Sequence, residues 1–555
     1  MAVSWLPTLQ GYQRDWLKAD ISAGIIVAVL IIPQSIAYAF LAGLPAETGL
    51  YAAMLPLLLY TLIGSSPTLA VGPVAIVSLM TLEALAPSAA SGFSMPAMAS
   101  VLALLVAAFM VLFYLVGLGR WTAFISHTVI SAFTSAAAIV IVINQLKHLS
   151  GLNIGRNGLF YQPVIELLTH LHQLVWPALA LAALSIVILW LWPRLTQGTI
   201  SKLGPLLVVT LGIISVQSGV LQVATVGAIP QGLPSLMLPA LLMEQMTQLP
   251  WKQLLPSAAI IALIGYLESL SVATAMAVKS RSRLLPNQEL LALGGANIAA
   301  ALSQGYPVAG GFGRSMVNLN AGARSQLAAV VTALSVAIVC LFLADWFSDL
   351  PTSVLAAIIV MAVVPLINWR SGWQAWRYQK SDGVIWLITF AGVLLMNAES
   401  GIFLGILLSL GVYLKRTSEP HIAEVGRYQH SDHFRNVERH SVTTCPQLLL
   451  VRIDENLYFA NSQLLDDFIQ RRLQQSSDVR HVVLIGSAIN HIDFDGYESL
   501  RQLITRLNER GIQLHLAEFK GPVMDQLQHS DLLKHLAPGQ VFFSASDALR
   551  QLGGK

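Results

Sequence analysis

The sequence of 555 residues predicts a polytopic α-helical membrane protein that ends in a water-soluble α/β domain. Hydrophobic residues make up 55% of the chain and charged residues only 11%. An ordinary soluble chain carries about 25% charged residues. Polar residues are concentrated near the end, since 16 of the 29 acidic residues follow position 420. Most of the chain is therefore expected to face lipid, and the last quarter to face water.

Apolar stretches recur from Ile21 to about Leu414, and they predict fourteen membrane segments. A helix needs about 20 apolar residues to cross the hydrocarbon core of a bilayer. Two segments are short and interrupted by glycine and proline, at 67–85 and 305–322. The other twelve are continuous, at 20–41, 48–64, 98–118, 122–145, 174–192, 204–218, 254–277, 288–303, 326–344, 352–367, 383–397 and 400–414.

The distribution of lysine and arginine supports the count of fourteen. Positive residues accumulate in cytoplasmic loops, so their position predicts orientation. Clusters precede the first segment or follow even-numbered ones: Arg14 and Lys18; Arg120; Arg194 and Lys202; Lys279, Arg281 and Arg283; Arg324; Arg370, Arg377 and Lys380; Lys415 and Arg416. Lys147 and Arg156 are the exceptions. Both termini are expected in the cytoplasm, and two seven-segment repeats of inverted topology are expected at about 19–218 and 254–414.

The two interrupted segments occupy the third position of each half. Paired, broken apolar segments at corresponding positions are the best sequence indication of a transporter binding site. The N-terminus of a half-helix exposes unpaired N–H groups and a positive dipole end, and these attract an anion. The alternative is that glycine and proline only kink two ordinary helices. The expected donors are Val71, Gly72, Val74 and Ala75 in the first segment, and Gly313, Arg314, Ser315 and Met316 in the second.

The residues after Glu419 alternate between apolar runs and amphipathic stretches. Strands are expected at 448–453, 482–485 and 513–517, and helices at 462–474, 496–510 and 523–529. Such alternation is typical of a compact α/β domain. We therefore divide the chain into a transmembrane transport domain at 1–418 and a cytoplasmic domain at 419–555.

Five motifs stand out along the chain: Ile32–Ala39, Glu47–Ala53, Leu69–Ala75, Gly311–Asn318 and Asn320–Ala323. With them, the chain resembles the sulfate permease family of anion transporters over nearly its whole length. The chain departs from the usual family residues at Thr48, Pro67 and Gly313. The tail is similar to a STAS domain at Ile492–Gly496, where Asp495 replaces the phosphorylatable serine of bacterial anti-sigma antagonists.

The resemblance implies a secondary active transporter of an inorganic oxyanion, with proton-coupled sulfate uptake by alternating access as the leading hypothesis. Sodium-coupled bicarbonate transport and exchange of chloride or dicarboxylates are alternatives within the family. A nucleobase carrier and a membrane-tethered sensor are further alternatives; the first would lack the tail and the motifs, and the second would not need broken helices. The resemblance also implies a homodimer in a bacterial inner membrane.

Four side chains are candidates for binding or coupling. Gln34 offers an amide donor, and Tyr38 lies one helical turn later on the same face. Packing is the alternative role for both. Glu268 and Arg314 lie inside predicted spans, where a charge is costly and usually faces a pathway. We expect Glu268 to exchange the coupling proton or to bind sodium; the alternative is a permanent ion pair with Arg314.

The remaining ionisable residues in the spans are assigned ordinary roles. His127 is expected to pack inside its span, and Glu83 and Glu399 are expected to be solvated near segment ends. Cys340 and Cys445 are too few for a metal-binding spacing and are not expected to form a disulfide. The sequence contains no hydrolytic triad, nucleotide loop or dense basic run. We therefore expect no enzymatic activity, no cofactor and no nucleic-acid partner.

Overall fold

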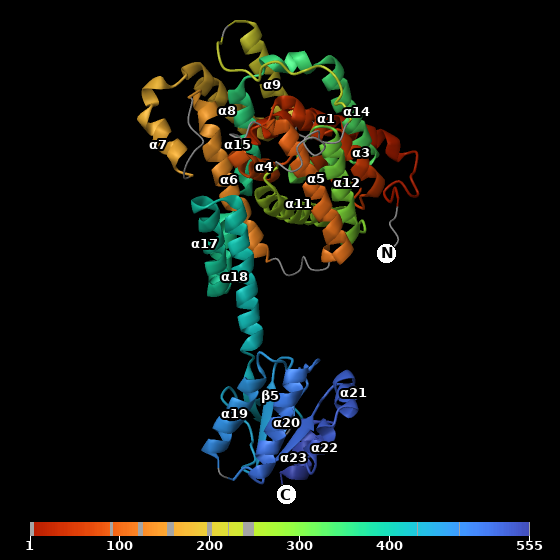
Figure 1. Ribbon diagram of the computed structural model, residues 1–555, viewed down its shortest axis with the longest axis vertical. Helices are drawn as coiled ribbons and strands as arrows, with labels where there is room; N and C mark the ends of the chain where they lie inside the picture. Colours follow the sequence, from red (N-terminus) through yellow and green to blue (C-terminus); the bar gives the residue numbers. More distant parts are fainter. Residues whose placement is uncertain are drawn as a thin grey trace. The chain divides into compact units, whose positions relative to one another are not determined.

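A computed structural model describes residues 5–88, 93–119, 126–152, 160–196, 203–219, 221–236, 249–429, 431–476 and 478–553. The chain forms two compact units, 1–409 and 410–555. The first unit is helical and contains one two-stranded ladder, and the second contains a six-stranded sheet (Figure 1). The predicted helical membrane domain followed by an α/β domain is confirmed.

The first half of the helical unit begins with a long helix and contains the first short half-helix. Its elements are α1 (Trp16–Leu41), α2 (Ala46–Ala52), α3 (Leu55–Ile63), β1 (Val71–Gly72), α4 (Ala75–Leu85), α5 (Met95–Val116), α6 (His127–Ser150), α7 (Gln162–Thr169), α8 (Trp176–Leu195) and α9 (Gly204–Gln217). The start of the span predicted at 122–145 lies outside the described residues, and α6 accounts for the rest.

The second half contains the second short half-helix and ends on a helix that extends into the C-terminal unit. Its elements are α11 (Trp251–Ser280), α12 (Pro286–Leu302), β2 (Ala309–Gly310), α13 (Phe312–Asn320), α14 (Leu327–Phe342), α15 (Thr352–Val363), α16 (Trp369–Tyr378), α17 (Lys380–Leu395) and α18 (Ala398–Ser418). Each of the fourteen predicted segments coincides with helix in the described residues. Within that part, eight helical stretches are long and apolar enough to cross a membrane.

Two α-helices in the described part of the first unit were not predicted as elements. One of them, α16, lies in the stretch that we expected to be a basic loop, and it exposes Trp369, Trp373 and Trp376. It also carries Arg370 and Arg377. Tryptophan and arginine together are typical of a helix at a membrane–water interface, where apolar rings and charged groups are both accommodated. The other is the short helix α7.

The C-terminal unit is built on a sheet with the order β4-β3-β5-β6-β7-β8. Strands β5 to β8 are parallel, and β3 is antiparallel to β4 and β5. The strands are β3 (Ile422–Arg427), β4 (Phe434–Asn436), β5 (Leu448–Ile453), β6 (His481–Ile485), β7 (Gln513–Ala517) and β8 (Val541–Phe542). The three predicted strands are thus confirmed as β5, β6 and β7, whereas β3, β4 and β8 were missed.

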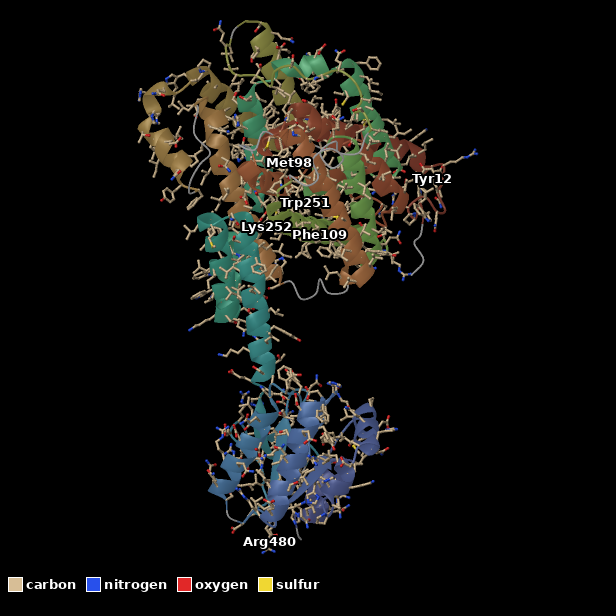
Figure 2. The ribbon with its side chains drawn as sticks, in the orientation of Figure 1. Tyr12, Met98, Phe109, Trp251, Lys252 and Arg480 are labelled. Carbon is tan, nitrogen blue, oxygen red and sulfur yellow. The ribbon has the colours of Figure 1, made fainter. Side chains whose placement is uncertain are left out.

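Helices cover both faces of this sheet. Four of them, α19 (Ser462–Gln475), α20 (Phe494–Glu509), α21 (Gly521–His529) and α22 (Leu532–Leu536), contribute to one hydrophobic core. The helix α23 (Ala545–Leu552) packs on a second core with Leu448, Leu450 and Val483. The predicted helices at 462–474, 496–510 and 523–529 correspond to α19, α20 and α21. Figure 2 labels Arg480, which lies just before β6 at one end of this unit.

A pair of histidines lies between β6 and β7. The Nδ1 atom of His481 lies 3.1 Å from Nε2 of His515, and Nδ1 of His515 accepts the Gln540 N–H at 3.0 Å. His515 is almost completely buried. Burial, followed by the charge that His481 can carry, lowers the pKa of His515 to about 4. His515 is therefore neutral in the folded domain near pH 7.

Candidate functional site

The two interrupted segments meet through a short antiparallel ladder. Val71 pairs with Gly310 and Gly72 pairs with Ala309, which joins β1 to β2. Each strand leads directly into a half-helix, since α4 follows β1 and α13 follows β2. The pairing brings the N-termini of α4 and α13 to one place. This is the juxtaposition that the sequence predicts for an anion site.

Polar side chains satisfy the backbone of the crossing strands. The Ser315 hydroxyl accepts the Ala70 N–H at 2.9 Å and donates to the Gly311 carbonyl at 2.7 Å. The Ser269 hydroxyl accepts the Gly310 N–H at 2.7 Å, and Asn297 Oδ1 accepts the Val308 N–H at 2.9 Å. Irregular backbone at membrane depth is tolerated only where such partners exist. The sequence interpretation missed Ser269 and Asn297, although polar residues in apolar helices were an available signal.

The half-helices begin slightly away from the predicted positions. In α4 the first intrahelical bond runs from the Ser78 N–H to the Val74 carbonyl, at 2.9 Å. In α13 it runs from the Ser315 N–H to the Gly311 carbonyl, at 3.1 Å. The first three N–H groups of each helix lack an intrahelical acceptor. They belong to Ala75, Ile76 and Val77 in α4 and to Phe312, Gly313 and Arg314 in α13.

Several predicted donors consequently have other positions. Val71 and Gly72 belong to β1, and Val74 is the extended residue that precedes α4. The Ser315 N–H is used inside α13, and Met316 lies in the following position, with its sulfur 3.6 Å from Lys279 Nζ. Ala75, Gly313 and Arg314 remain at the helix starts. The shift arises because β-pairing uses the residues on the N-terminal side of each half-helix.

Arg314 connects the two half-helices and is only partly satisfied. Its side chain is 3% exposed, and Nη1 donates to the Pro73 carbonyl at 2.5 Å. Its Nε and Nη2 atoms are buried without a hydrogen-bond partner. A Cβ atom at Gly311 would lie 2.8 Å from Nη2, so the guanidinium group folds closely against the glycine backbone. A buried cation with unused donors is a strong site for an anion.

The helices α1 and α11 complete the site, because each contacts both α4 and α13. Helix α1 supplies Gln34, which is partly exposed, and Tyr38, which is buried. Helix α11 supplies Glu268, whose Oε2 atom is buried without a hydrogen-bond partner. Tyr38, Glu268 and the unpredicted Tyr306 all lie within electrostatic reach of Arg314. The structure thus brings the predicted residues Tyr38, Glu268 and Arg314 together, with Gly313 next to Arg314 in α13, and Gln34 lies one turn before Tyr38 on α1.

The carboxylate and the guanidinium do not form a closed pair. Among the described residues, no ion pair with an N···O distance within 4.0 Å joins Glu268 to Arg314. Two fully buried carboxylates in this unit, Glu289 and Asp20, are engaged at both oxygen atoms. Glu289 accepts hydrogen bonds from Tyr60 and from Ser65, and Asp20 accepts them from the backbone and hydroxyl of Ser325. Glu268 therefore differs from these structural carboxylates in having unused hydrogen-bonding capacity.

Open space lies in front of the first turn of α13. A Cβ atom built on Gly313 would meet no atom within 4 Å. The preceding Phe312 is 49% exposed. Accessible space therefore adjoins the first turn of α13, which carries N–H groups without an intrahelical acceptor.

Three other ionisable residues were assigned ordinary roles. Glu83 is half-buried, and its Oε2 accepts the Ala398 N–H at 3.1 Å at the start of α18. Glu399 is also half-buried, with an enclosed Oε1 atom. These two residues lie at helix ends as expected but are less solvated than predicted. The expectation that His127 packs inside a span is wrong, because it is exposed in the first turn of α6.

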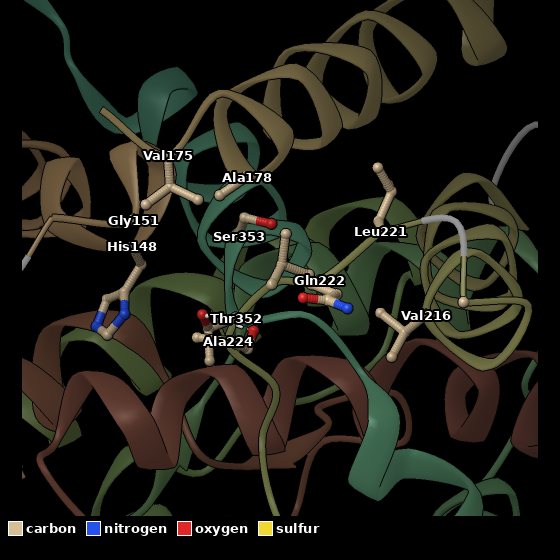
Figure 3. A pocket seen from close by; sticks show the side chains of 12 residues that line it. His148, Gly151, Val175, Ala178, Val216, Leu221, Gln222, Ala224, Thr352 and Ser353 are labelled. Carbon is tan, nitrogen blue, oxygen red and sulfur yellow. Dashed lines mark hydrogen bonds between the residues drawn. The ribbon is translucent and has the colours of Figure 1, made fainter. Parts of the chain in front are cut away.

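A separate cavity of about 490 Å³ lies between α6, α8, α9 and α15 (Figure 3). Its lining is mostly apolar, with His148, Gln222, Thr352 and Ser353 as polar members. None of the predicted anion-site residues lines it. This cavity is therefore distinct from the space between the half-helices.

Comparison with known proteins identifies the family. The sequence profile of the sulfate permease family matches residues 17–389, and the STAS domain profile matches residues 439–548. A probable sulfate transporter 4.2 of Arabidopsis thaliana is 33% identical, over 98% of this chain and 82% of its own. A probable sulfate transporter of Mycobacterium tuberculosis is 30% identical, over 99% of this chain and 98% of its own.

Solved structures share the fold. The structure of SLC26A9 superposes with a TM-score of 0.88 at 23% identity and covers 98% of this chain and 91% of its own. The transmembrane domain of the cyanobacterial bicarbonate transporter BicA superposes with a TM-score of 0.61 at 24% identity, over 72% of this chain and 99% of its own. The two profiles and the sulfate transporter relatives show that the chain belongs to the sulfate permease family and carries a STAS domain.

Proposed function

We propose that the protein is a secondary active transporter that couples the uptake of sulfate to protons. The observation that carries this proposal is the buried guanidinium of Arg314, which has two unused donors where the half-helices meet. The names of the relatives support an inorganic anion as the substrate class, since they are sulfate transporters. The anion would lie between the N-termini of α4 and α13.

The site offers a sulfate ion three kinds of donor. Backbone N–H groups come from the first turns of both half-helices, and their dipoles point positive ends at the anion. Arg314 supplies Nε and Nη2, which form charge-assisted hydrogen bonds with an oxyanion. Gln34 supplies an amide donor from α1. The several oxygen atoms of a tetrahedral oxyanion suit donors that arrive from different helices.

Coupling to protons follows from the charges around the anion. Entry of a dianion against a negative-inside potential of 100 mV costs about 5 kcal/mol, or about 2.3 kcal/mol for each charge. With Arg314 cationic and Glu268 ionised, a bound sulfate leaves a net charge of about −2 in the site; protonation of Glu268 reduces it to about −1. Glu268 is suited to this role because its Oε2 atom is buried without a partner.

The arrangement of the chain in the membrane is part of the proposal. Alternating access would expose the half-helix site to the two sides in turn, with two inverted repeats of seven segments supplying the symmetry. Both termini would be cytoplasmic, in the inner membrane of a bacterium, and the protein would form a homodimer. The domain boundary would lie at 418–419, where α18 ends.

Transport into proteoliposomes tests the proposal. Labelled sulfate, bicarbonate and a dicarboxylate should be offered separately under an inward proton gradient, an inward sodium gradient and no gradient. Accumulation of sulfate on the proton gradient alone is expected. Sodium-driven bicarbonate uptake would favour the bicarbonate alternative, and gradient-independent counterflow with chloride or dicarboxylate would favour an exchanger. Absence of all anion transport would refute the proposal.

A further inference from the structure

The C-terminal unit contains a second basic site, which the transport function does not use. A cavity of about 440 Å³ opens where β3, β4 and β5 lie side by side. We call it the basic pocket, and its lining is His421, Arg435, Asn436, Arg439, His440, Arg452 and Asp454. Three arginines and one aspartate give it a net charge of 3 − 1 = +2 with both histidines neutral.

The single carboxylate of the basic pocket is already occupied. Arg452 Nε lies 2.6 Å from Asp454 Oδ1, and His421 Nδ1 lies 2.9 Å from Asp454 Oδ2. Partial burial by itself raises the pKa of Asp454, but the hydrogen bonds from Arg452 and His421 outweigh burial and lower it. Asp454 therefore stays ionised and bound to two partners. It is not free to neutralise the other two arginines.

Arg435 and Arg439 are the unpaired cations of this pocket. Both side chains are exposed, and neither takes part in an ion pair or side-chain hydrogen bond among the described residues. The nearby acidic residues have other partners: Glu424 and Glu438 both pair with Arg472. His440 completes the edge and packs its ring against Tyr428. Two free guanidinium groups therefore converge on a cavity with no available counter-charge of its own.

We propose that the basic pocket binds a tetrahedral oxyanion, a phosphate or sulfate group that is either free in solution or carried by a lipid headgroup. Planar guanidinium forks match the oxygen atoms of such groups. A dianion with several oxygens can engage Arg435 and Arg439 together, which a single carboxylate does less well. The volume exceeds that of one small ion, so a substituted phosphate fits as well as an inorganic one.

The position of the pocket in the chain makes both sources possible. His421 follows Ser418, the last residue of the apolar helix α18, by three positions, and α18 carries Lys415 and Arg416 in its last turn. Basic residues next to a membrane helix attract anionic headgroups. The same residues also attract soluble phosphate or sulfate. The inference is independent of what the membrane unit transports.

Hydrogen–deuterium exchange of the full-length protein in detergent tests this site locally. The probes are inorganic phosphate, inorganic sulfate and dioctanoyl phosphatidic acid, with dioctanoylglycerol as the lipid control without phosphate. Peptides that cover residues 431–454 report the pocket and not the membrane site. The double variant Arg435→Gln, Arg439→Gln removes the free cations. The matched control Arg471→Gln, Arg480→Gln removes two exposed arginines elsewhere in the same unit.

At least one probe is expected to protect these peptides in the unmodified protein and in the control variant. The half-saturating concentration should rise by about tenfold or more in the Arg435, Arg439 variant, because two charge-assisted contacts are lost. Protection by an inorganic ion identifies a soluble ligand, and protection by phosphatidic acid alone identifies a lipid headgroup. Absence of protection by every probe, or equal protection in both variants, would overturn the proposal. An unchanged thermal unfolding midpoint verifies folding of each variant.

Discussion

Enlargement of Gly313 gives the sharpest test of the anion site. Gly313 is the second residue of α13, and a Cβ atom there would meet nothing within 4 Å. Replacement by alanine, leucine or tryptophan therefore adds a side chain whose Cβ atom does not clash with the rest of the protein. Alanine also favours a helix over glycine by up to about 1 kcal/mol. We expect the folded protein to tolerate the series, while the added atoms fill the space in front of the half-helix.

The expected loss of anion binding can be worked out from the hydrogen-bond donors that a large side chain would block. A large side chain would separate an anion from the N–H groups of the first turn and from Arg314. A hydrogen bond to a charged group contributes about 1.5–3 kcal/mol. Loss of two such bonds costs about 3–6 kcal/mol, which weakens binding about 100-fold to 10,000-fold. Alanine should have a small effect, leucine an intermediate one, and tryptophan should abolish sulfate transport.

Two other glycines control for folding. Gly411 in α18 also has nothing within 4 Å of a Cβ atom, so Gly411→Trp should fold and transport normally. A Cβ atom at Gly49 would lie 2.1 Å from the Ser35 carbonyl oxygen, so Gly49→Ala should fail to fold. Size-exclusion profiles and thermal unfolding measure folding, and equilibrium sulfate binding with proteoliposome uptake measures function. Normal binding by folded Gly313→Trp protein would exclude an anion at this position.

Other expected outcomes concern coupling, pH and orientation. Glu268→Gln mimics the protonated acid and should keep sulfate exchange but lose accumulation on an inward proton gradient; continued accumulation would assign Glu268 a structural role. In the STAS domain, His515 binds a proton more tightly in the unfolded state than in the folded state. The free energy of unfolding should therefore decrease as the pH is lowered from the ordinary histidine pKa to about 4. Urea unfolding should lose about 1.4 kcal/mol between roughly pH 7.5 and pH 5.5, and His515→Gln should remove most of this dependence. Single cysteines at positions 10 and 480, in a chain without Cys340 and Cys445, should react with an impermeant label only after permeabilisation; labelling of intact cells would contradict cytoplasmic termini.

The sequence predicted the existence of the half-helices but not their first residues. Glycine and proline interrupt an apolar segment by local chemistry, and this information is present in the chain around Pro73 and Gly311. The start of each helix depends on pairing of Val71 with Gly310, residues that are far apart in the sequence. That pairing assigns Val71 and Gly72 to a strand and leaves Ile76, Val77 and Phe312 among the helix-start donors. Local spacing cannot supply this information.

In the soluble domain too, the sequence predicts some elements, whereas others depend on tertiary pairing. The strands β5 and β7 are buried apolar runs, and hydrophobicity alone identifies them. The strand β4 is short and lies at the sheet edge, and β8 has only two residues, so neither carries a recognisable apolar pattern. Their positions are set by backbone pairing with β3 and β7. Burial is encoded locally, whereas edge pairing depends on neighbours that the fold supplies.

Composition and periodicity by themselves determined a helical membrane protein with a soluble tail, because lipid and water each require a particular surface. They also singled out Glu268 and Arg314, because a charge in an apolar span is costly and therefore informative. Only the tertiary structure decided how these charges are used. It places the Arg314 guanidinium against Pro73 and leaves Glu268 without a hydrogen bond at Oε2. Side-chain partners across helices depend on packing in three dimensions, and no spacing along one helix specifies them.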